Sequence, residues 1–297
     1  MTNLPSDITE RAKNLIFKFE FGGFDFKNID GGQPYTLNYE QKKYRQDELV
    51  SLLFSALPYF ALTEAEYSEF HELKKSPSYY DQTAINRIVK PGKKAGDYGE
   101  IILFLLLELF YGSKKLVTKV FYKTSNSLPV FGSDATHFTK EDGKITLWFG
   151  ESKFYQNFTD ALDAAFESID GFLKTKIKGE VEFLTPSRVE INKNTDKDLR
   201  DEVIKLIDGK PSLDDVPIKV PVLITYELAE LKNFDDVAGS HFIEKMKAEF
   251  ESRYQQIQSK NWQKQYKNVT FVFLLLPIQD VSVLKDLIRK KDEGTRI

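Results

Sequence analysis

The chain has 297 residues, of which 41% are hydrophobic and 29% are charged, with three histidines and no cysteine. This composition is typical of a globular protein with enough apolar material for a core, and the lack of cysteine excludes disulfides, thiolate nucleophiles, iron–sulfur clusters and thiolate zinc sites. The net charge of −3, from 42 basic and 45 acidic residues, gives no global indication of a polyanionic partner.

The first ninety residues have a mixed pattern, which predicts an N-terminal accessory region, 1–90, of α+β type. Phenylalanines alternate with other residues over 17–26, which predicts a strand and a turn, and the glycine pairs at 22–23 and 31–32 are interpreted as turns. Helices are expected over 45–57 and 64–74, with Pro58 and Pro77 marking breaks. Since there is no signal-peptide profile and no apolar run approaches the ~20 residues that cross a bilayer, we expect a cytoplasmic protein without a membrane segment.

The remaining residues, 91–297, alternate between strand and helix patterns. A leucine-rich run at 101–110 predicts a buried helix, and strands are expected over 116–124, 130–138 and 145–155, the last two joined by 140–143 as an antiparallel hairpin. After a helix expected at 157–173 and a polar segment at 186–215, strands at 220–228 and 269–277 alternate with helices at 241–258 and 281–290. This order predicts an α/β protein with a mixed central sheet flanked by helices.

Positive charge is concentrated between residues 84 and 178, which carry 14 basic and 11 acidic side chains. Two acid-free stretches lie there, the first with Arg87, Lys90, Lys93 and Lys94, the second with Lys114, Lys115, Lys119 and Lys123. Such stretches can neutralise backbone phosphates, although short charge clusters are at least as often solvated loops or strand edges. We expect Lys90, Lys93, Lys94 and Lys119 to contact a nucleic-acid backbone if a site for phosphodiester chemistry lies beside them.

Four charged residues occupy positions where a charged side chain is costly. Glu100 opens the leucine-rich helix, Asp134 lies in the second of the three strands, and Glu151 and Lys153 lie near the end of the third. If residues 140–143 form the hairpin turn, paired positions sum to about 283, which places Asp134 opposite position 149 and diagonal to Glu151. The two carboxylates are therefore expected within reach of each other.

Strand alternation extends this argument to Lys153. The apolar row at 145, 147 and 149 ends in Glu151 and Lys153 on the same face, and buried charge of this kind needs compensation. Because converging carboxylates repel each other unless a hard cation lies between them, we expect Asp134 and Glu151 to bind one or two Mg²⁺ or Mn²⁺ ions, with Glu100 completing or supporting the site. Lys153 would orient or deprotonate a water, or stabilise charge on a phosphate, as metal-assisted phosphodiester hydrolysis requires.

Each of these residues also has a purely structural interpretation. Asp97 as an N-cap, with Glu100 three residues later, would make a capping box that satisfies helix-end amides without a metal. Glu151 and Lys153 would form an exposed ion pair if their strand lay at a sheet edge. His137 is expected to be a packed or surface histidine rather than a ligand.

The three-part order of these motifs resembles the core of PD-(D/E)xK nucleases. It consists of Gly99-Glu100 at a helix start, Gly132-Ser133-Asp134 in a strand and Glu151-Ser152-Lys153 in the next strand. More narrowly, the stretches GDYGEIILFLLLE, FGSDATHF and LWFGESKFYQNFTDAL resemble the HamA family, the nuclease subunits of the Hachiman anti-phage defence system. The resemblance departs from the superfamily pattern at Ser133, where proline commonly precedes the aspartate.

The resemblance implies a restriction-endonuclease-like core over 91–297 and a Mg²⁺-dependent DNA nuclease restrained by a superfamily 2 helicase similar to HamB. Since no base-reading module is evident, cleavage would be largely independent of sequence. Two alternatives stay open. One is a stand-alone restriction- or repair-type metal nuclease, and the other is a non-catalytic DNA-binding regulatory subunit with a decayed nuclease fold.

Overall fold

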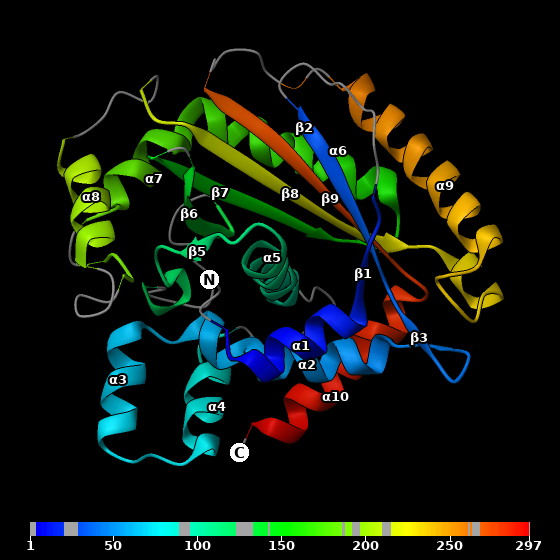
Figure 1. Cartoon of the computed structure of the whole chain (residues 1–297), viewed down its shortest axis with the longest axis horizontal. Helices are drawn as coiled ribbons and strands as arrows, with labels where there is room; N and C mark the ends of the chain where they lie inside the picture. Colours follow the sequence, from blue (N-terminus) through cyan, green and yellow to red (C-terminus); the bar gives the residue numbers. More distant parts are fainter. Residues whose placement is uncertain are drawn as a thin grey trace.

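The computed structural model describes residues 4–20, 29–88, 96–122, 133–141, 143–185, 188–191, 197–209, 215–260, 262 and 268–296. Within these ranges seven strands form one mixed sheet in the order β1-β2-β9-β8-β7-β6-β5, and helices lie on both sides of it (Figure 1). The predicted α/β class with a mixed, helix-flanked sheet is therefore confirmed.

The sheet is parallel in its centre and antiparallel at its margins. β2, β9, β8 and β7 run parallel to one another. β1 pairs antiparallel with β2, and β6 pairs antiparallel with both β7 and β5. The near-continuous apolar sequences of β8 and β9 fit strands that are covered on both faces. The strands are β1 (Ile16–Lys18), β2 (Ile29–Leu37), β5 (Lys114–Lys115), β6 (Ala135–Glu141), β7 (Lys144–Phe154), β8 (Ile218–Glu227) and β9 (Val269–Ile278), and β3 (Tyr39–Glu40) pairs separately with β4 (Lys43–Tyr44).

Six of the described α-helices overlap the predicted ones, whereas α1, α4, α7 and α8 were not predicted. The α-helices are α1 (Ser6–Leu15), α2 (Gln46–Ala61), α3 (Glu64–Glu72), α4 (Pro77–Ile85), α5 (Gly96–Phe110), α6 (Phe158–Gly171), α7 (Ile177–Phe183), α8 (Lys197–Asp208), α9 (Ser240–Ser259) and α10 (Val281–Thr295). Three further helical turns are η1 (Lys119–Tyr122), the π-helical η2 (Phe172–Lys176) and η3 (Ala229–Asn233). Within the described ranges no single helix has both the length and the apolar composition of a membrane span, and α2 and α3 reach them only together, across a bend of 97°.

Two expectations about proline and glycine are wrong. Pro58 does not end a helix, because α2 continues through it to Ala61. The glycines at 31 and 32 do not form a turn, since they lie within β2, where the pairing with β9 shifts register between Asp30 and Gln33. A register shift of this kind adds a local irregularity to a strand without reversing the chain, so glycine here indicated a bulge rather than a turn.

The strand predicted over 116–124 is also wrong. β5 ends at Lys115, and the chain then enters η1. The ammonium of Lys115 donates hydrogen bonds to the carbonyl oxygens of Tyr59 (2.8 Å) and Leu62 (2.9 Å) at the C-terminal end of α2. A lysine that satisfies the free carbonyls of a helix end ties this segment to α2 instead of extending the sheet.

The β6–β7 hairpin is confirmed, but its register differs from the prediction. The strands pair from Ala135 with Gly150 to Glu141 with Lys144, so both strands extend into the expected loop. Gly143 has a φ of 78°, the left-handed conformation that glycine adopts without steric cost in tight hairpin turns. The pairing is shifted by two residues from the predicted one, and Asp134 therefore lies level with Glu151 rather than diagonal to it.

Two glycines allow α5 to lie close against β7. A Cβ atom on Gly150 would lie 2.7 Å from Cδ2 of Leu103 on α5, and a Cβ on Gly99 would lie 3.2 Å from Oγ of Ser152. Since Gly150 and Ser152 face α5, strand alternation directs Glu151 and Lys153 to the opposite face. On that side α6 covers the sheet, with Phe172 packing against Phe149 just beyond the end of the helix.

The first ninety residues contribute strands to the same sheet. β2 pairs with β9, and one continuous set of buried apolar side chains includes Leu4 near one end of the described chain and Ile288 near the other. The proposed division into an accessory region, 1–90, and a nuclease domain, 91–297, stays a prediction.

Candidate active site

Asp134 is held at the mouth of the hairpin, directly against β7. Its N–H donates to the carbonyl oxygen of Gly150 (2.7 Å), and its Oδ2 accepts from the N–H (2.7 Å) and Oγ (3.0 Å) of Ser152. These contacts fix one carboxylate oxygen beside the residue that separates Glu151 from Lys153. Asp134 and Glu151 are close enough for the charge of one to influence the other.

Glu151 is a buried carboxylate on the face of β7 that is covered by α6. Only 7% of its side chain is exposed. Burial, and then the negative charge of Asp134, raise the pKa of Glu151 to about 7, although Lys153 and a hydrogen bond with Ser168 of α6 act in the opposite direction. A bound cation would stabilise the ionised form of Glu151 against the effects of burial and of Asp134. Groups whose pKa is shifted in this way are concentrated at functional sites.

Lys153 forms an ion pair with Glu151, and 18% of its side chain is exposed. Burial disfavours the charged ammonium, but the charges of Glu151 and Asp134 outweigh burial and raise the pKa of Lys153 above its ordinary value. The ammonium is therefore charged at neutral pH. In this state it can donate hydrogen bonds and stabilise negative charge, but it cannot accept a proton.

The structure groups Glu100 with Asp134, not with Glu151. Glu100 and Asp134 line a cavity of about 20 Å³ on the α5 side of the sheet, a volume that suits one water molecule. Since α5 already includes Gly96, Asp97 lies inside the helix and is not its N-cap, which removes the capping-box interpretation of Glu100. Glu100 is thus placed to support Asp134, from the other side of the sheet than Glu151.

His137 is a packed residue, as expected. It is buried, and its Nδ1 lies 3.0 Å from Oγ of Ser113. Burial, and then the charge of Lys115, lower the pKa of His137 to about 3, so the ring is neutral at physiological pH. It belongs to the wall of the small cavity.

The structure describes only some of the residues in the two basic stretches. Lys90, Lys93 and Lys94 lie outside the described residues, so their expected contact with a backbone phosphate stays a prediction. Arg87 forms a partly buried ion pair with Glu66. Lys119 is turned inward, with 10% of its side chain exposed, and a phosphate would meet its ammonium only after its internal contacts were broken.

Sequence reasoning missed Glu180, the partner of Lys119. Glu180 belongs to α7 and is 1% exposed, and its Oε1 accepts from both the N–H and the Oγ of Ser133, next to Asp134. The sequence did contain a signal, since Glu180 interrupts a series of apolar positions, at 177, 183 and 184, that become buried. An acidic residue within an apolar helix face indicates a buried partner.

The donor atoms around Asp134 and Glu151 suit a hard divalent cation. All are oxygens, and Mg²⁺ is commonly bound through one or two protein carboxylates while it keeps several waters. Among the described residues no group of three or more histidine, aspartate or glutamate side chains is arranged to hold a metal. The fit therefore rests on two carboxylates, Asp134 and Glu151, rather than on the three that were expected.

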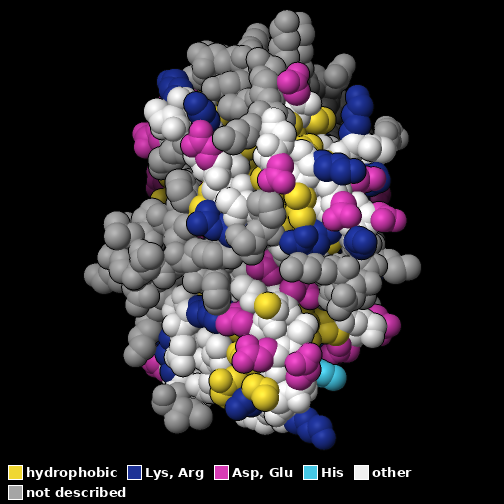
Figure 2. Space-filling model, turned by 90° about the vertical axis from the view of Figure 1, so that its left-hand side faces the viewer, with side chains coloured by type: hydrophobic (Ala, Val, Ile, Leu, Met, Phe, Trp, Pro, Cys, Tyr) yellow, Lys and Arg dark blue, Asp and Glu magenta, His cyan; other side chains and the backbone are white. Residues whose placement is uncertain are grey.

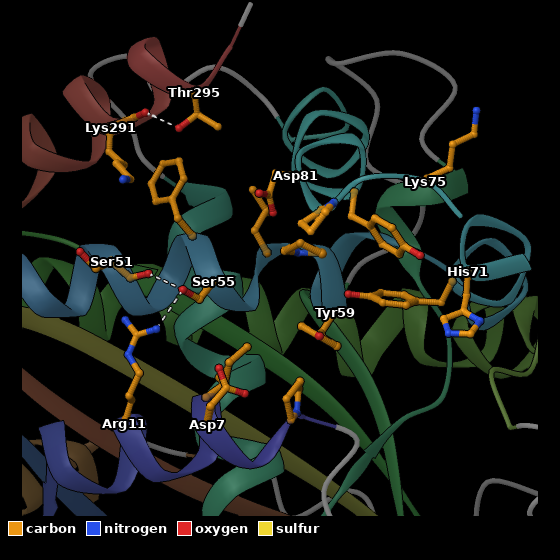
Figure 3. Close-up of a pocket in the computed structure, with 18 residues that line it drawn as sticks. Asp7, Arg11, Ser51, Ser55, Tyr59, His71, Lys75, Asp81, Lys291 and Thr295 are labelled. Atoms are coloured by element: carbon orange, nitrogen blue, oxygen red, sulfur yellow. Dashed lines mark hydrogen bonds between the residues drawn. The ribbon is translucent and has the colours of Figure 1, made fainter. Parts of the chain in front are cut away.

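A second and larger cleft, of about 730 Å³, lies between α1, α2, the α3–α4 pair and the end of α10 (Figure 3). It contains none of the four predicted catalytic residues. Its lining mixes both signs of charge, so it defines no single class of ligand; the charged side chains are those of Asp7, Arg11, Lys75, Asp81 and Lys291. The described basic and acidic side chains are likewise interspersed on the face shown in Figure 2.

A family model described as HamA matches residues 16–291 of the chain. The match spans almost all described elements, including α5, the β6–β7 hairpin and α6. Comparison with curated proteins gives no match.

Proposed function

The chain belongs to the HamA family, a family of Hachiman defence proteins, and from this membership we propose that it is a metal-dependent nuclease that hydrolyses DNA phosphodiester bonds. One observation carries the proposal. The buried carboxylate of Glu151 forms an ion pair with Lys153, while burial and the negative charge of Asp134 oppose its ionisation, a penalty that a bound cation would offset.

Each residue of this group has a role that its surroundings support. Asp134 and Glu151 would hold Mg²⁺, with Mn²⁺ as a substitute, and Glu100 would support Asp134 from the α5 side. When bound, the metal would polarise the phosphate and lower the pKa of a bound water. Because Lys153 is charged at neutral pH, its role would be to donate hydrogen bonds to the attacking water or the phosphate and to stabilise the charge that develops there.

The proposed substrate and partner follow from the family and from the basic stretch predicted at Lys90, Lys93 and Lys94. Contacts to phosphates through Lys90, Lys93 and Lys94 would make binding depend on salt and little on sequence. A nuclease of that kind endangers its own cell, so we expect restraint by a superfamily 2 helicase similar to HamB. A stand-alone restriction- or repair-type nuclease would instead cleave robustly and specifically without a helicase.

The decisive experiment is a Mg²⁺-dependent DNA cleavage assay of the wild type, Glu151→Gln and Lys153→Met, with and without any helicase that is encoded beside it. Both variants should lose at least about 100-fold in cleavage rate, the loss typical of removing a group that stabilises transition-state charge. Lys144→Met, at the exposed start of the same strand, is a matched control and should cleave like the wild type.

Two results would count against the proposal. If folded Glu151→Gln cleaves as fast as the wild type, the site is wrong. If the wild type binds DNA but shows no Mg²⁺-dependent cleavage with or without the helicase, the alternative of a non-catalytic DNA-binding subunit is favoured.

A further inference from the structure

A buried ion pair lies next to the proposed metal site, on the side away from Lys153. The Nζ atom of Lys119 pairs with Oε1 of Glu180 and donates to the carbonyl oxygen (2.8 Å) and Oγ (2.7 Å) of Ser133. The same Oε1 accepts from the N–H of Ser133 (3.2 Å). Lys119, Glu180 and Ser133 therefore all contact one another, and Ser133 directly precedes Asp134 in the chain.

The position of Glu180 depends on an irregular helix. α6 continues through the π-helical turn η2 into α7, and Glu180 lies one turn into α7, on the face that also buries Ile177 and Phe183. Wide π turns of this kind are rare and recur at functional sites. Among the described residues the second oxygen of Glu180, Oε2, has no hydrogen-bond partner, so the whole carboxylate depends on Lys119 and Ser133.

Lys119 also lies close to the proposed catalytic carboxylates. Burial lowers its pKa, whereas the charge of Glu180, followed by those of Asp134 and Glu100, acts in the opposite direction. Lys119 and Glu100 line the same small cavity as Asp134. An ammonium in this position is an alternative counter-ion for the carboxylate that a divalent cation would use.

We propose that Glu180 is a positioning residue that holds the ammonium of Lys119 against Ser133, so that the carboxylate of Asp134 stays available to a divalent cation. This inference rests on the proposed role of Asp134 as a metal ligand. Without the negative charge of Glu180, the nearest negative charges for a buried ammonium are those of Asp134 and Glu100. Lys119 then competes with the metal for the same oxygen atoms, since a buried cation requires a partner.

The experiment measures Mn²⁺ binding by titration calorimetry, using the full chain without DNA. Glu180→Gln keeps the size of the side chain and an oxygen that can accept from Ser133, but removes the charge. The Mn²⁺ dissociation constant should rise about tenfold or more, as for other residues that orient a metal ligand. Glu182→Gln, an exposed substitution of the same type on the same helix, is the matched control and should bind like the wild type.

The double variant Lys119→Met, Glu180→Gln separates competition from packing. It removes both charges, so it leaves neither an unpaired buried charge nor a competing ammonium. Its Mn²⁺ dissociation constant should return to within about twofold of the wild-type value, whereas a packing role would leave it as weak as the single variant. Circular dichroism checks that each variant is folded.

The outcomes distinguish this inference from the proposed function. If Glu180→Gln binds Mn²⁺ as the wild type does, or if the double variant stays about tenfold weaker, the positioning role is refuted. If Asp134→Asn also binds Mn²⁺ like the wild type, the metal site itself is wrong. Should Glu180→Gln alone fail to fold, the double variant still keeps the inference refutable, because Mn²⁺ binding about tenfold weaker than that of the wild type would exclude competition.

Discussion

Glu151→Gln should change the way in which the stability of the protein depends on pH. In the metal-free folded protein burial and Asp134 raise the pKa of Glu151 to about 7, whereas its ordinary value is 4.5. The folded state therefore keeps this proton at a pH where the unfolded chain has released it. Stability from this group is fully present below about pH 4.5 and is lost as the pH rises toward 7. The glutamine variant has no such proton and should lack this slope.

The expected magnitude follows from the interval between the two pKa values. Each pH unit of difference corresponds to about 1.4 kcal/mol, so the group loses about 2 to 3 kcal/mol of stability between about pH 5 and pH 8. The free energy of unfolding of Glu151→Gln, taken relative to that of the wild type, should therefore be about 2 to 3 kcal/mol higher at pH 8 than at pH 5. The effect of Lys153 on Glu151 is already contained in the pKa of about 7, so the loss of this partner adds no further difference between the two pH values.

Urea unfolding of both proteins in EDTA, at the two pH values, measures the effect. Glu141→Gln on β6 is the control, because there hydrogen bonds with Thr139 and Lys219 outweigh partial burial and lower the pKa of the carboxyl. Because a lowered pKa moves the titration of Glu141 below this interval, its substitution should change stability by nearly the same amount at both pH values. A free-energy difference between wild type and Glu151→Gln that is the same at both pH values would refute the electrostatic account of the site.

Two further predictions concern the placement of α5. Gly150→Ala should lower the free energy of unfolding by about 1 to 3 kcal/mol, because its Cβ would lie 2.7 Å from Leu103. Gly171→Ala is the control in the same urea assay. It has open space around it and should be neutral or stabilising. Equal effects of the two substitutions would show that α5 has room to move. Tyr98→Phe removes a buried hydrogen bond of 2.9 Å to Asp292 and should cost about 1 to 2 kcal/mol, and a cost no larger than that of Tyr79→Phe, which is exposed, would contradict this.

In the β6–β7 hairpin, the sequence predicted the strand face of each site residue but not its partner across the hairpin. Alternation assigned Glu151 and Lys153 to one face of β7, and that assignment survives although the predicted register was wrong by two residues. A shift of two preserves the face of every side chain, because the side-chain period of a strand is two. It changes the partner across the hairpin, however, and only the exact length of the turn fixes the position of Asp134.

The surroundings of Lys119 show what the sequence could not supply. Its charge predicted contact with solvent or phosphate, whereas the structure places its ammonium against Glu180, 61 residues later in the chain. Sequence patterns record the periodicity within an element, but not which distant element completes a buried pair. The sequence likewise could not choose between the two expected roles of Glu100, completing or supporting the site, because a helix start can face either side of a sheet.

The pairing of β2 with β9 has a consequence for the order in which the protein folds during synthesis. Ile29 lies beside Phe271, so one partner leaves the ribosome long before the other has been made. At roughly 5 to 20 residues per second, β2 waits on the order of ten to fifty seconds for its neighbour. During that interval the β6–β7 hairpin, whose strands are adjacent in sequence, can already form. The sheet is therefore completed last where β9 enters between β2 and β8.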